Sequence, residues 1–115
     1  MAGLIIYKIV DSGLWETARA IGRFTGAPVD QQDGFIHFST AAQVRETAER
    51  HFAGLDGLLL VAVDAAALGE SLRWEPSRGG QLFPHLYGDL PLTAVRAEHQ
   101  LTLDGSGTHA FPPLG

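Results

Sequence analysis

The chain has 115 residues, of which 45% are hydrophobic and 18% charged. A chain of this length and composition folds as a single globular domain, which excludes intrinsic disorder of the whole chain. Its 13 acidic residues outnumber the 8 basic ones and give a net charge of −5, so no basic stripe is available to follow nucleic-acid phosphates and we expect no nucleic-acid partner.

The absence of cysteine removes several kinds of chemistry at once. Disulfides, thiolate catalysis and cysteine-ligated zinc are all excluded. The apolar opening of the chain has no basic flank before it and indicates a strand, not a signal peptide. The apolar run of residues 58–63 is far too short to span a bilayer. We therefore expect a soluble, cytoplasmic protein with no membrane partner.

The first half of the chain predicts two strands and a helix around a loop. Residues 4–10 are rich in β-branched side chains and indicate a strand. Asp11 or Ser12 can then cap a helix that carries an apolar stripe. Residues 26–34 show no apolar period and predict a loop, and residues 35–39 predict a short strand.

The middle of the chain predicts a second helix and a buried strand. Thr40 and Gln43 have the spacing of a capping box and open a helix that runs to about Phe52. The continuous apolar run of residues 58–63 is typical of a central strand. Residues 76–88 combine prolines and glycines and predict an irregular loop.

The end of the chain predicts one more strand and a tail. Residues 93–103 alternate well enough for a final strand, so residues 1–103 form one domain and residues 104–115 an irregular tail. His109, in that tail, is expected at the surface. Strands outnumber long helices, and both good helices fall in the first half, which favours an α+β fold over a doubly wound sheet.

Residues 34–40, with the sequence Gly-Phe-Ile-His-Phe-Ser-Thr, are the first candidate for a functional motif. Successive residues of a strand face opposite sides. His37 and Ser39 therefore share one face of the strand, and Ile36 and Phe38 share the other. Thr40 begins the next helix, where free N–H groups favour an anion or a polar oxygen. The alternative is structural: Ser39 or Thr40 caps the helix, and His37 bonds to a neighbouring backbone.

Residues 74–88 form the second candidate motif. His85 and Tyr87 share a face if the chain is extended there. Arg78 stands next to two glycines and offers a planar fork for phosphate or carboxylate. In the alternative interpretation, Arg78 pairs with an acid such as Glu75 and only pins the loop.

Metal and hydrolase sites find less support. His37 and His85 with Glu75 have the composition of a two-histidine, one-carboxylate site, but no His-x-His or His-x-x-x-His spacing supports it, so we expect no metal. Ser39 lies in no Gly-x-Ser-x-Gly turn of the kind that presents a nucleophilic serine. The sequence contains neither a Walker loop nor a dinucleotide-binding glycine fingerprint.

Several segments together resemble a known family and cover nearly the whole chain up to about Leu103. These segments are Tyr7-Lys8-Ile9, Trp15, residues 33–41, Thr47-Ala48 with Phe52, Val63-Asp64 and residues 74–88. They resemble the Domain of Unknown Function 952 family, whose members look like compact versions of the ADP-ribosyltransferase fold. That resemblance implies a split, antiparallel pair of small sheets with a cleft that holds NAD.

The resemblance also implies which residues face the ligand. The positions that match the two long motifs are His37, Ser39, Thr40, Arg78, His85 and Tyr87. On this basis Tyr87 stacks on a nicotinamide or adenine ring, Arg78 binds the pyrophosphate, and His37 and His85 are the candidate catalytic residues. Glu75 belongs to the same ligand-binding set.

The chain also departs from the pattern that the resemblance implies. Transferases of this fold present a glutamate late in the chain, and near that position this sequence has His85 or Tyr87, with Glu75 upstream. Such transferases usually have a histidine or an arginine on the first strand, which has no clear match here; the nearest polar residue is Lys8. We therefore expect a domain that binds NAD or another nucleotide-like small molecule and acts as an ADP-ribosyltransferase-like enzyme. The alternative is a module that kept the fold without the chemistry.

Overall fold

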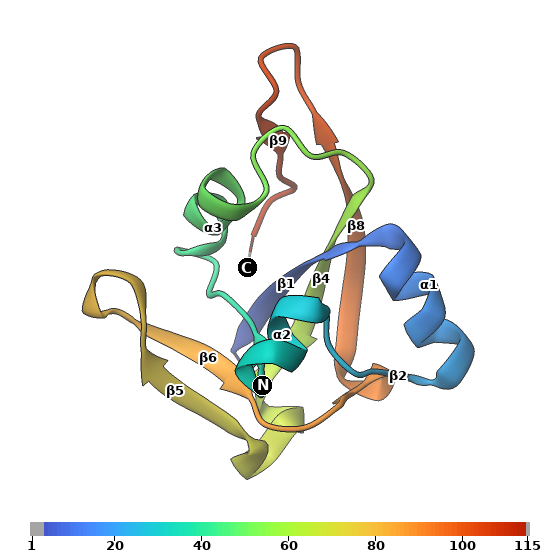
Figure 1. Cartoon of the computed structure of the whole chain (residues 1–115), viewed down its shortest axis with the longest axis vertical. Helices are drawn as coiled ribbons and strands as arrows, with labels where there is room; N and C mark the ends of the chain where they lie inside the picture. Colours follow the sequence, from blue (N-terminus) through green and yellow to red (C-terminus); the bar gives the residue numbers. More distant parts are fainter. Residues whose placement is uncertain (1–3, 115) are drawn as a thin grey trace.

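The computed structural model describes residues 4–114, apart from the side chain of Arg78. The apolar run of residues 58–63 forms the central strand of a four-stranded antiparallel sheet, as predicted (Figure 1). The strands of this first sheet are, in the order of their pairing, β1 (Ile5–Asp11), β4 (Leu58–Asp64), β8 (Val95–Leu103) and β9 (His109–Ala110).

Strand β4 is apolar throughout because both of its faces are covered. Alternate side chains enter two separate cores, one with Leu59, Val61 and Val63 and the other with Leu58, Leu60 and Ala62. Helix α1 (Ser12–Ile21) covers the first core with its buried Trp15. Helix α3 (Val44–His51) covers the second core with Val44. The sheet therefore lies between two helices.

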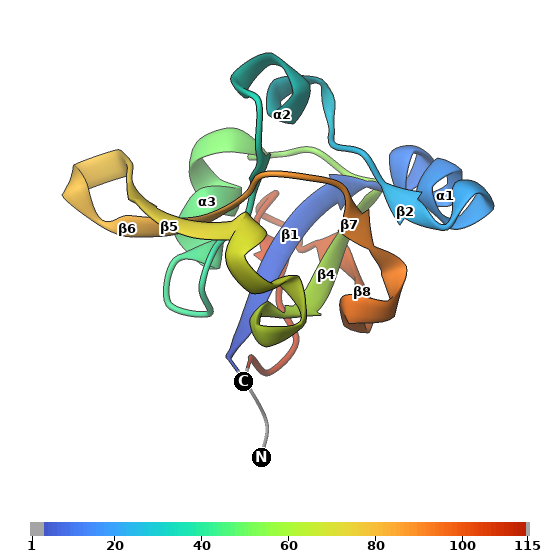
Figure 2. The ribbon, with the colours of Figure 1, turned by 90° about the horizontal axis from the view of Figure 1, so that it is seen from below.

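A second, three-stranded sheet projects from the edge of the first. It pairs, in order, β3 (Ile36–His37), β6 (Leu82–Leu86) and β5 (Leu72–Pro76). Tyr7 on β1 and Ser39 after β3 exchange two backbone hydrogen bonds, of 2.8 and 2.9 Å, and so join the two sheets. The β5–β6 ribbon extends to one side of the first sheet, and α1 lies on the other (Figure 2).

Smaller elements complete the domain. They are the paired strands β2 (Arg23–Phe24) and β7 (Leu90–Pro91), the helix α2 (Pro28–Asp33), and three 3₁₀ helices at Ala65–Ser71, Arg78–Gly80 and Leu92–Ala94. The architecture is α+β with several antiparallel sheets, in agreement with the predicted class. Among residues 4–114, no helix is long and apolar enough to cross a membrane.

Helix α2 corrects the prediction of a loop over residues 26–34. Pro28 occupies the first turn, Asp30 accepts a hydrogen bond of 2.8 Å from the Ala27 N–H, and Gly34 ends the helix with φ of 87°. These start and stop signals are ordinary. The helix is too short for an apolar period, and its one buried side chain is the carboxylate of Asp30, so hydrophobic patterning could not reveal it.

Strand β6 corrects the prediction of an irregular loop over residues 76–88. Pro84 pairs with Trp74 in the ladder to β5, and its carbonyl accepts a hydrogen bond of 3.0 Å from Phe38. The backbone nitrogen and oxygen of one strand residue point to the same side, so the nitrogen of Pro84, which carries no hydrogen, faces β3 and not β5. Pro84 lies just beyond the residues of β6 that pair with β3. The ladder to β5 loses no bond.

The tail also differs from its prediction. Residues 104–115 are predicted to be irregular, yet β9 lies within them and pairs with β8. Asp104 holds the turn by accepting N–H bonds from Ser106 and Thr108, at 2.8 and 3.1 Å. His109 is buried, not at the surface, and its Nε2 donates to the Leu55 carbonyl at 2.7 Å.

The boundaries of two elements are tighter than predicted. The strand over residues 35–39 is reduced to β3 and the bridge at Ser39. Helix α3 begins at Val44, not at Thr40, because residues 41–43 form a turn. Half of the predicted capping box is present, since the Gln43 side chain accepts the Thr40 N–H at 3.0 Å.

Candidate functional site

A pocket of about 520 Å³ lies beside the open edge of β1, where the two sheets part. Strands β1, β3 and β6 and helices α2 and α3 contribute its walls. Its polar lining residues are Lys8, Asp33, His37, Ser39, Thr47, His51, Ser77 and His85. The two motifs singled out in the sequence thus meet in one cavity.

His37 and His85 come together because their strands pair. They are directly opposite each other in the β3–β6 ladder, and their ring centroids lie 5.6 Å apart. Phe35 packs against both rings, at 4.6 Å from His37 and 4.1 Å from His85, and stacks nearly parallel on the latter. Two candidate catalytic residues from distant parts of the sequence therefore share one wall.

Of the remaining predicted site residues whose side chains the structure describes, only Ser39 lines the pocket. Its hydroxyl is hydrogen bonded to that of Thr47 at 2.9 Å. Thr40, Glu75 and Tyr87 are not among the lining residues. The backbone N–H of Thr40 donates to the Gln43 side chain, but the capping interpretation for Thr40 is wrong, because the residue at the N-cap of α3 is Gln43.

Arg78 is placed only in part. Its backbone belongs to the 3₁₀ helix that joins β5 to β6, directly after Ser77, which lines the pocket. The Arg78 side chain lies outside the described part of the chain.

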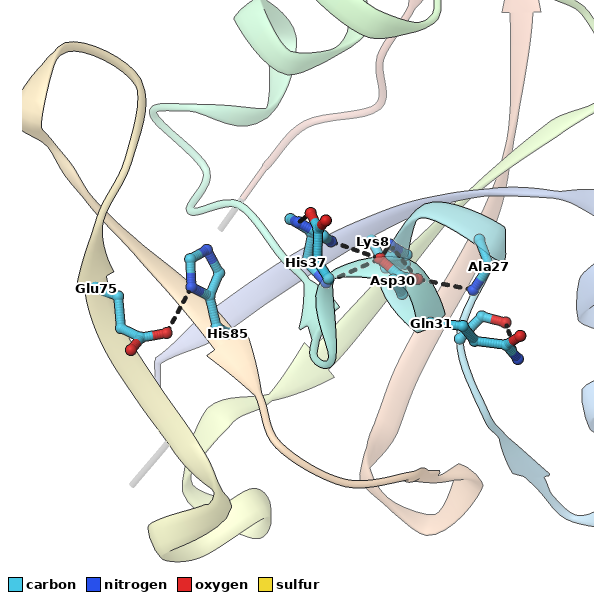
Figure 3. A network of polar contacts seen from close by, with 9 residues as sticks. Lys8, Ala27, Asp30, Gln31, His37, Glu75 and His85 are labelled. Atoms are coloured by element: carbon cyan, nitrogen blue, oxygen red, sulfur yellow. Dashed lines mark hydrogen bonds and ion pairs between the residues drawn. The ribbon is translucent and has the colours of Figure 1, made fainter.

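His37 belongs to a chain of charged side chains that the sequence did not reveal (Figure 3). Its Nδ1 lies 2.7 Å from Asp30 Oδ1, and its Nε2 lies 2.9 Å from Asp33 Oδ2. Asp30 also binds the Lys8 ammonium at 2.9 Å. A ring nitrogen must carry a proton to donate to a carboxylate. Both ring nitrogens of His37 are therefore occupied by carboxylates.

The pKa values in this chain follow from burial and pairing. Burial acts to raise the pKa of Asp30, but the hydrogen bond from His37, the charge and hydrogen bond of Lys8 and the Ala27 N–H outweigh it, and the pKa falls to about 2. Burial lowers the pKa of the Lys8 ammonium, against the charge and hydrogen bond of Asp30, which raise it. Asp30 is thus held ionised.

His85 is held differently, by a single acid behind the pocket wall. Its Nδ1 lies 2.8 Å from Glu75 Oε1, and the Tyr87 hydroxyl donates to the same oxygen at 2.7 Å. The hydrogen bonds from His85 and then from Tyr87 lower the pKa of Glu75. The hydrogen bond to Glu75 raises the pKa of Tyr87. The Arg73 guanidinium lies 4.9 Å from the centre of the Tyr87 ring.

Sequence reasoning missed Lys8, Asp30 and Asp33 as members of the site. One signal was available for Lys8: a lysine within a strand of large apolar residues needs a buried partner. Nothing in the sequence identified that partner as Asp30, 22 residues further along the chain. Among the described residues, no three His, Asp or Glu side chains are grouped so that they could hold a metal ion.

Comparison with known proteins places the chain in a family. The model of the family described as "Protein of unknown function (DUF952)" matches residues 9–98, and the chain belongs to this family. Among curated proteins, none matches the chain.

Two solved structures of one relative share the fold. The X-ray structure of protein CC0527 from Caulobacter crescentus is 49% identical, covers 92% of this chain and 93% of its own, and superposes with a TM-score of 0.89. The solution NMR structure of CC0527 is 50% identical, covers 90% of each chain and has a TM-score of 0.81. The arrangement of two sheets around the pocket is therefore similar to that of experimentally determined structures.

Proposed function

We propose that this chain is a compact member of the ADP-ribosyltransferase-like fold, which binds NAD or an ADP-ribosyl compound in the pocket and acts as an ADP-ribosyltransferase-like enzyme. The observation that carries the proposal is the composition of the pocket, which joins an open strand edge of the first sheet to two oriented histidines of the second. The pocket volume of about 520 Å³ lies within the range of small-molecule sites.

The open edge of β1 supports recognition of an amide. The backbone N–H and C=O of Tyr7 point outward to Ser39, so those of Ile9, two residues further, point outward as well. Within residues 4–114, no backbone group bonds to Ile9 on that side, and Ile9 lines the pocket. A carboxamide, with one donor and one acceptor, is complementary to such an edge. The nicotinamide group of NAD carries this amide.

The rest of the pocket supports a polar ligand with sugar and phosphate groups. The hydroxyls of Ser39 and Thr47 can exchange hydrogen bonds with ribose. We assign Arg78 to the pyrophosphate, because it follows Ser77 at the pocket and matches the second family motif. Tyr87 acts from behind the wall, through Glu75.

Calorimetric titration tests the binding part of the proposal. We expect NAD, ADP-ribose and nicotinamide to release or absorb heat on binding, and nicotinate to bind more weakly than nicotinamide because a carboxylate cannot donate to the C=O of Ile9. The absence of heat with all of these compounds at millimolar concentration would contradict the proposal. Release of nicotinamide from NAD tests the enzymatic part.

A non-catalytic binding module is the second candidate, and one observation favours it. Among the described residues, none that lines the pocket is a glutamate, and Glu75 is occupied by His85 and Tyr87. A transferase of this fold is expected to use a glutamate at the reacting ribose. A metabolite that raises the melting temperature of the protein without being consumed would favour the module over the enzyme.

A further inference from the structure

The two histidines of the pocket wall are not equivalent as proton acceptors. Both ring nitrogens of His37 face carboxylates, those of Asp30 and Asp33, so neither nitrogen is available to a ligand in the pocket. His85 has one acid partner, Glu75, on Nδ1. Within the described part of the chain, the hydrogen bond on Nδ1 is the one that the His85 ring makes, and the residue lines the pocket.

We infer that His85 is the general base of the pocket: Nε2 takes the proton of a hydroxyl or water nucleophile, and Glu75 is the positioning residue that holds the proton of the ring on Nδ1. The identity of the bond that reacts rests on the proposed function. The identification of His85 as the base rests on the geometry of β3, β5 and β6.

Three contacts fix the His85 ring for this role. Glu75 binds Nδ1 from the neighbouring strand, and Tyr87 donates to the same carboxylate oxygen, which holds that oxygen in place. Phe35 stacks on the ring with an angle of 20° between the planes. The other ring nitrogen points away from Glu75 (Figure 3). A base whose orientation is set before the substrate arrives loses little entropy in the reaction.

The state of Glu75 agrees with this assignment. Hydrogen bonds from His85 and Tyr87 lower its pKa, so the carboxylate is ionised at neutral pH. An ionised carboxylate accepts the Nδ1–H, so in the neutral ring Nε2 is the nitrogen that carries the free lone pair. The same charge stabilises the imidazolium that forms when Nε2 takes a proton, as in other carboxylate–histidine pairs.

The reaction that follows is balanced. The oxygen of the acceptor hydroxyl forms a bond to C1′ of the nicotinamide ribose, and its proton passes to His85 Nε2. The bond from C1′ to the nicotinamide nitrogen breaks, and its electron pair leaves with nicotinamide, which becomes neutral. The acceptor is thus an O–H group: water gives hydrolysis of NAD, and an alcohol gives an O-linked ADP-ribosyl product.

The kinetic test compares His85→Ala with His99→Ala. His99 is exposed on β8 and does not line the pocket, so its variant controls for loss of a histidine. We expect His85→Ala to lower kcat for nicotinamide release by roughly 10²–10⁴-fold, with NAD still bound. Glu75→Gln keeps the shape but loses the charge and is expected to lower kcat with little change in KM, and Glu75→Asp to restore part of it. Unchanged kcat in His85→Ala would overturn the inference.

A second test does not require turnover. Nitrogen NMR of the histidine rings at neutral pH is expected to show His85 as the tautomer with protonated Nδ1, and that signature is expected to change in Glu75→Gln. Diethyl pyrocarbonate, which acylates ring nitrogens with a free lone pair, is expected to modify His85 and to spare His37, both of whose ring nitrogens contact carboxylates. Protonation of Nε2 instead of Nδ1 would overturn the inference.

The two proposals fail separately. If the protein binds none of NAD, ADP-ribose and nicotinamide, the proposed function is wrong. The NMR measurement of the His85 tautomer still decides whether Nε2 of this ring is oriented to accept a proton. If NAD binds and is cleaved equally well by His85→Ala, the function stands and the base is wrong.

Discussion

The Lys8 ammonium lies 2.9 Å from each carboxylate oxygen of Asp30, and the two side chains are only 6% and 1% exposed. This buried ion pair ties β1 to α2. Because Asp30 also binds the ring and the backbone N–H of His37, the same pair fixes one of the two histidines at the pocket. The fold and the site therefore depend on one carboxylate.

Asp30→Asn is expected to destabilise the protein strongly. The amide keeps the shape of the side chain but leaves Lys8 as an uncompensated charge in the core, which costs roughly 3–5 kcal/mol of unfolding free energy. Urea unfolding measures the loss. Asp89→Asn is the matched control, because Asp89 pairs with Arg23 at 3.0 Å in an exposed position. That variant is expected to lose less than about 1 kcal/mol. Equal losses in the two variants would contradict the prediction.

Asp30 also predicts how stability depends on pH. Its pKa is about 2 in the folded protein against an ordinary value of 3.8, so its ionised form stabilises the folded state. This contribution, about 2 kcal/mol, is fully present above pH 3.8 and is lost as the pH falls toward 2. Urea unfolding at several pH values should show a smaller fall of stability with acid in Asp30→Asn than in the unsubstituted protein. Parallel curves would argue against it.

Hydrophobic pattern predicted the elements that build the cores and missed those that depend on polar contacts. Strand β4 is recognisable from its apolar run, and helix α1 from its cap and apolar stripe. Helix α2 has a single buried side chain, and that side chain is charged. Strand β6 contains Pro84, and only its register against β3 and β5 shows that the missing N–H does no harm. Information of this kind lies in pairing, not in local sequence.

The site, like the fold, was predictable from the sequence where it depends on local pattern and not where it depends on tertiary pairing. Strand alternation placed His37 and Ser39 on one face, and the structure shows both at the pocket. The pairing of His37 with His85 across 48 positions of sequence depends on the β3–β6 register, which a single sequence does not contain. The difference between the two rings depends on Asp30 and Glu75, whose placement is likewise tertiary.

Gly34 is expected to be the glycine that orients the first motif. It ends α2 in the left-handed region, with φ of 87°, and the chain then turns into Phe35 and β3. A Cβ at Gly34 would meet no heavy atom within 4 Å, so the cost of Gly34→Ala is conformational and amounts to about 1 kcal/mol.

Two variants control for this prediction by thermal or urea unfolding. Gly105 also has open space around it but does not have a left-handed φ, and Gly105→Ala is expected to leave stability unchanged. Gly34→Asn is expected to recover part of the loss, because asparagine tolerates the left-handed region better than alanine. A loss in Gly105→Ala as large as in Gly34→Ala would show that the backbone conformation is not the cause.

Asp33 is expected to weaken the binding of an anionic ligand in the free protein. Its carboxylate, 44% exposed at the pocket, lies 2.9 Å from His37 Nε2, the ring nitrogen that could otherwise donate to a phosphate. We expect Asp33→Asn to bind ADP-ribose about threefold more tightly at low salt. The gain should shrink at about 1 M salt, where charges are screened within about 3 Å.

Asp89→Asn removes an equal charge at a position that does not line the pocket and should leave the affinity unchanged. Calorimetry at the two salt concentrations decides the matter: weaker binding by Asp33→Asn would mean that Asp33 itself contacts the ligand, for which the ribose hydroxyls are the natural partners.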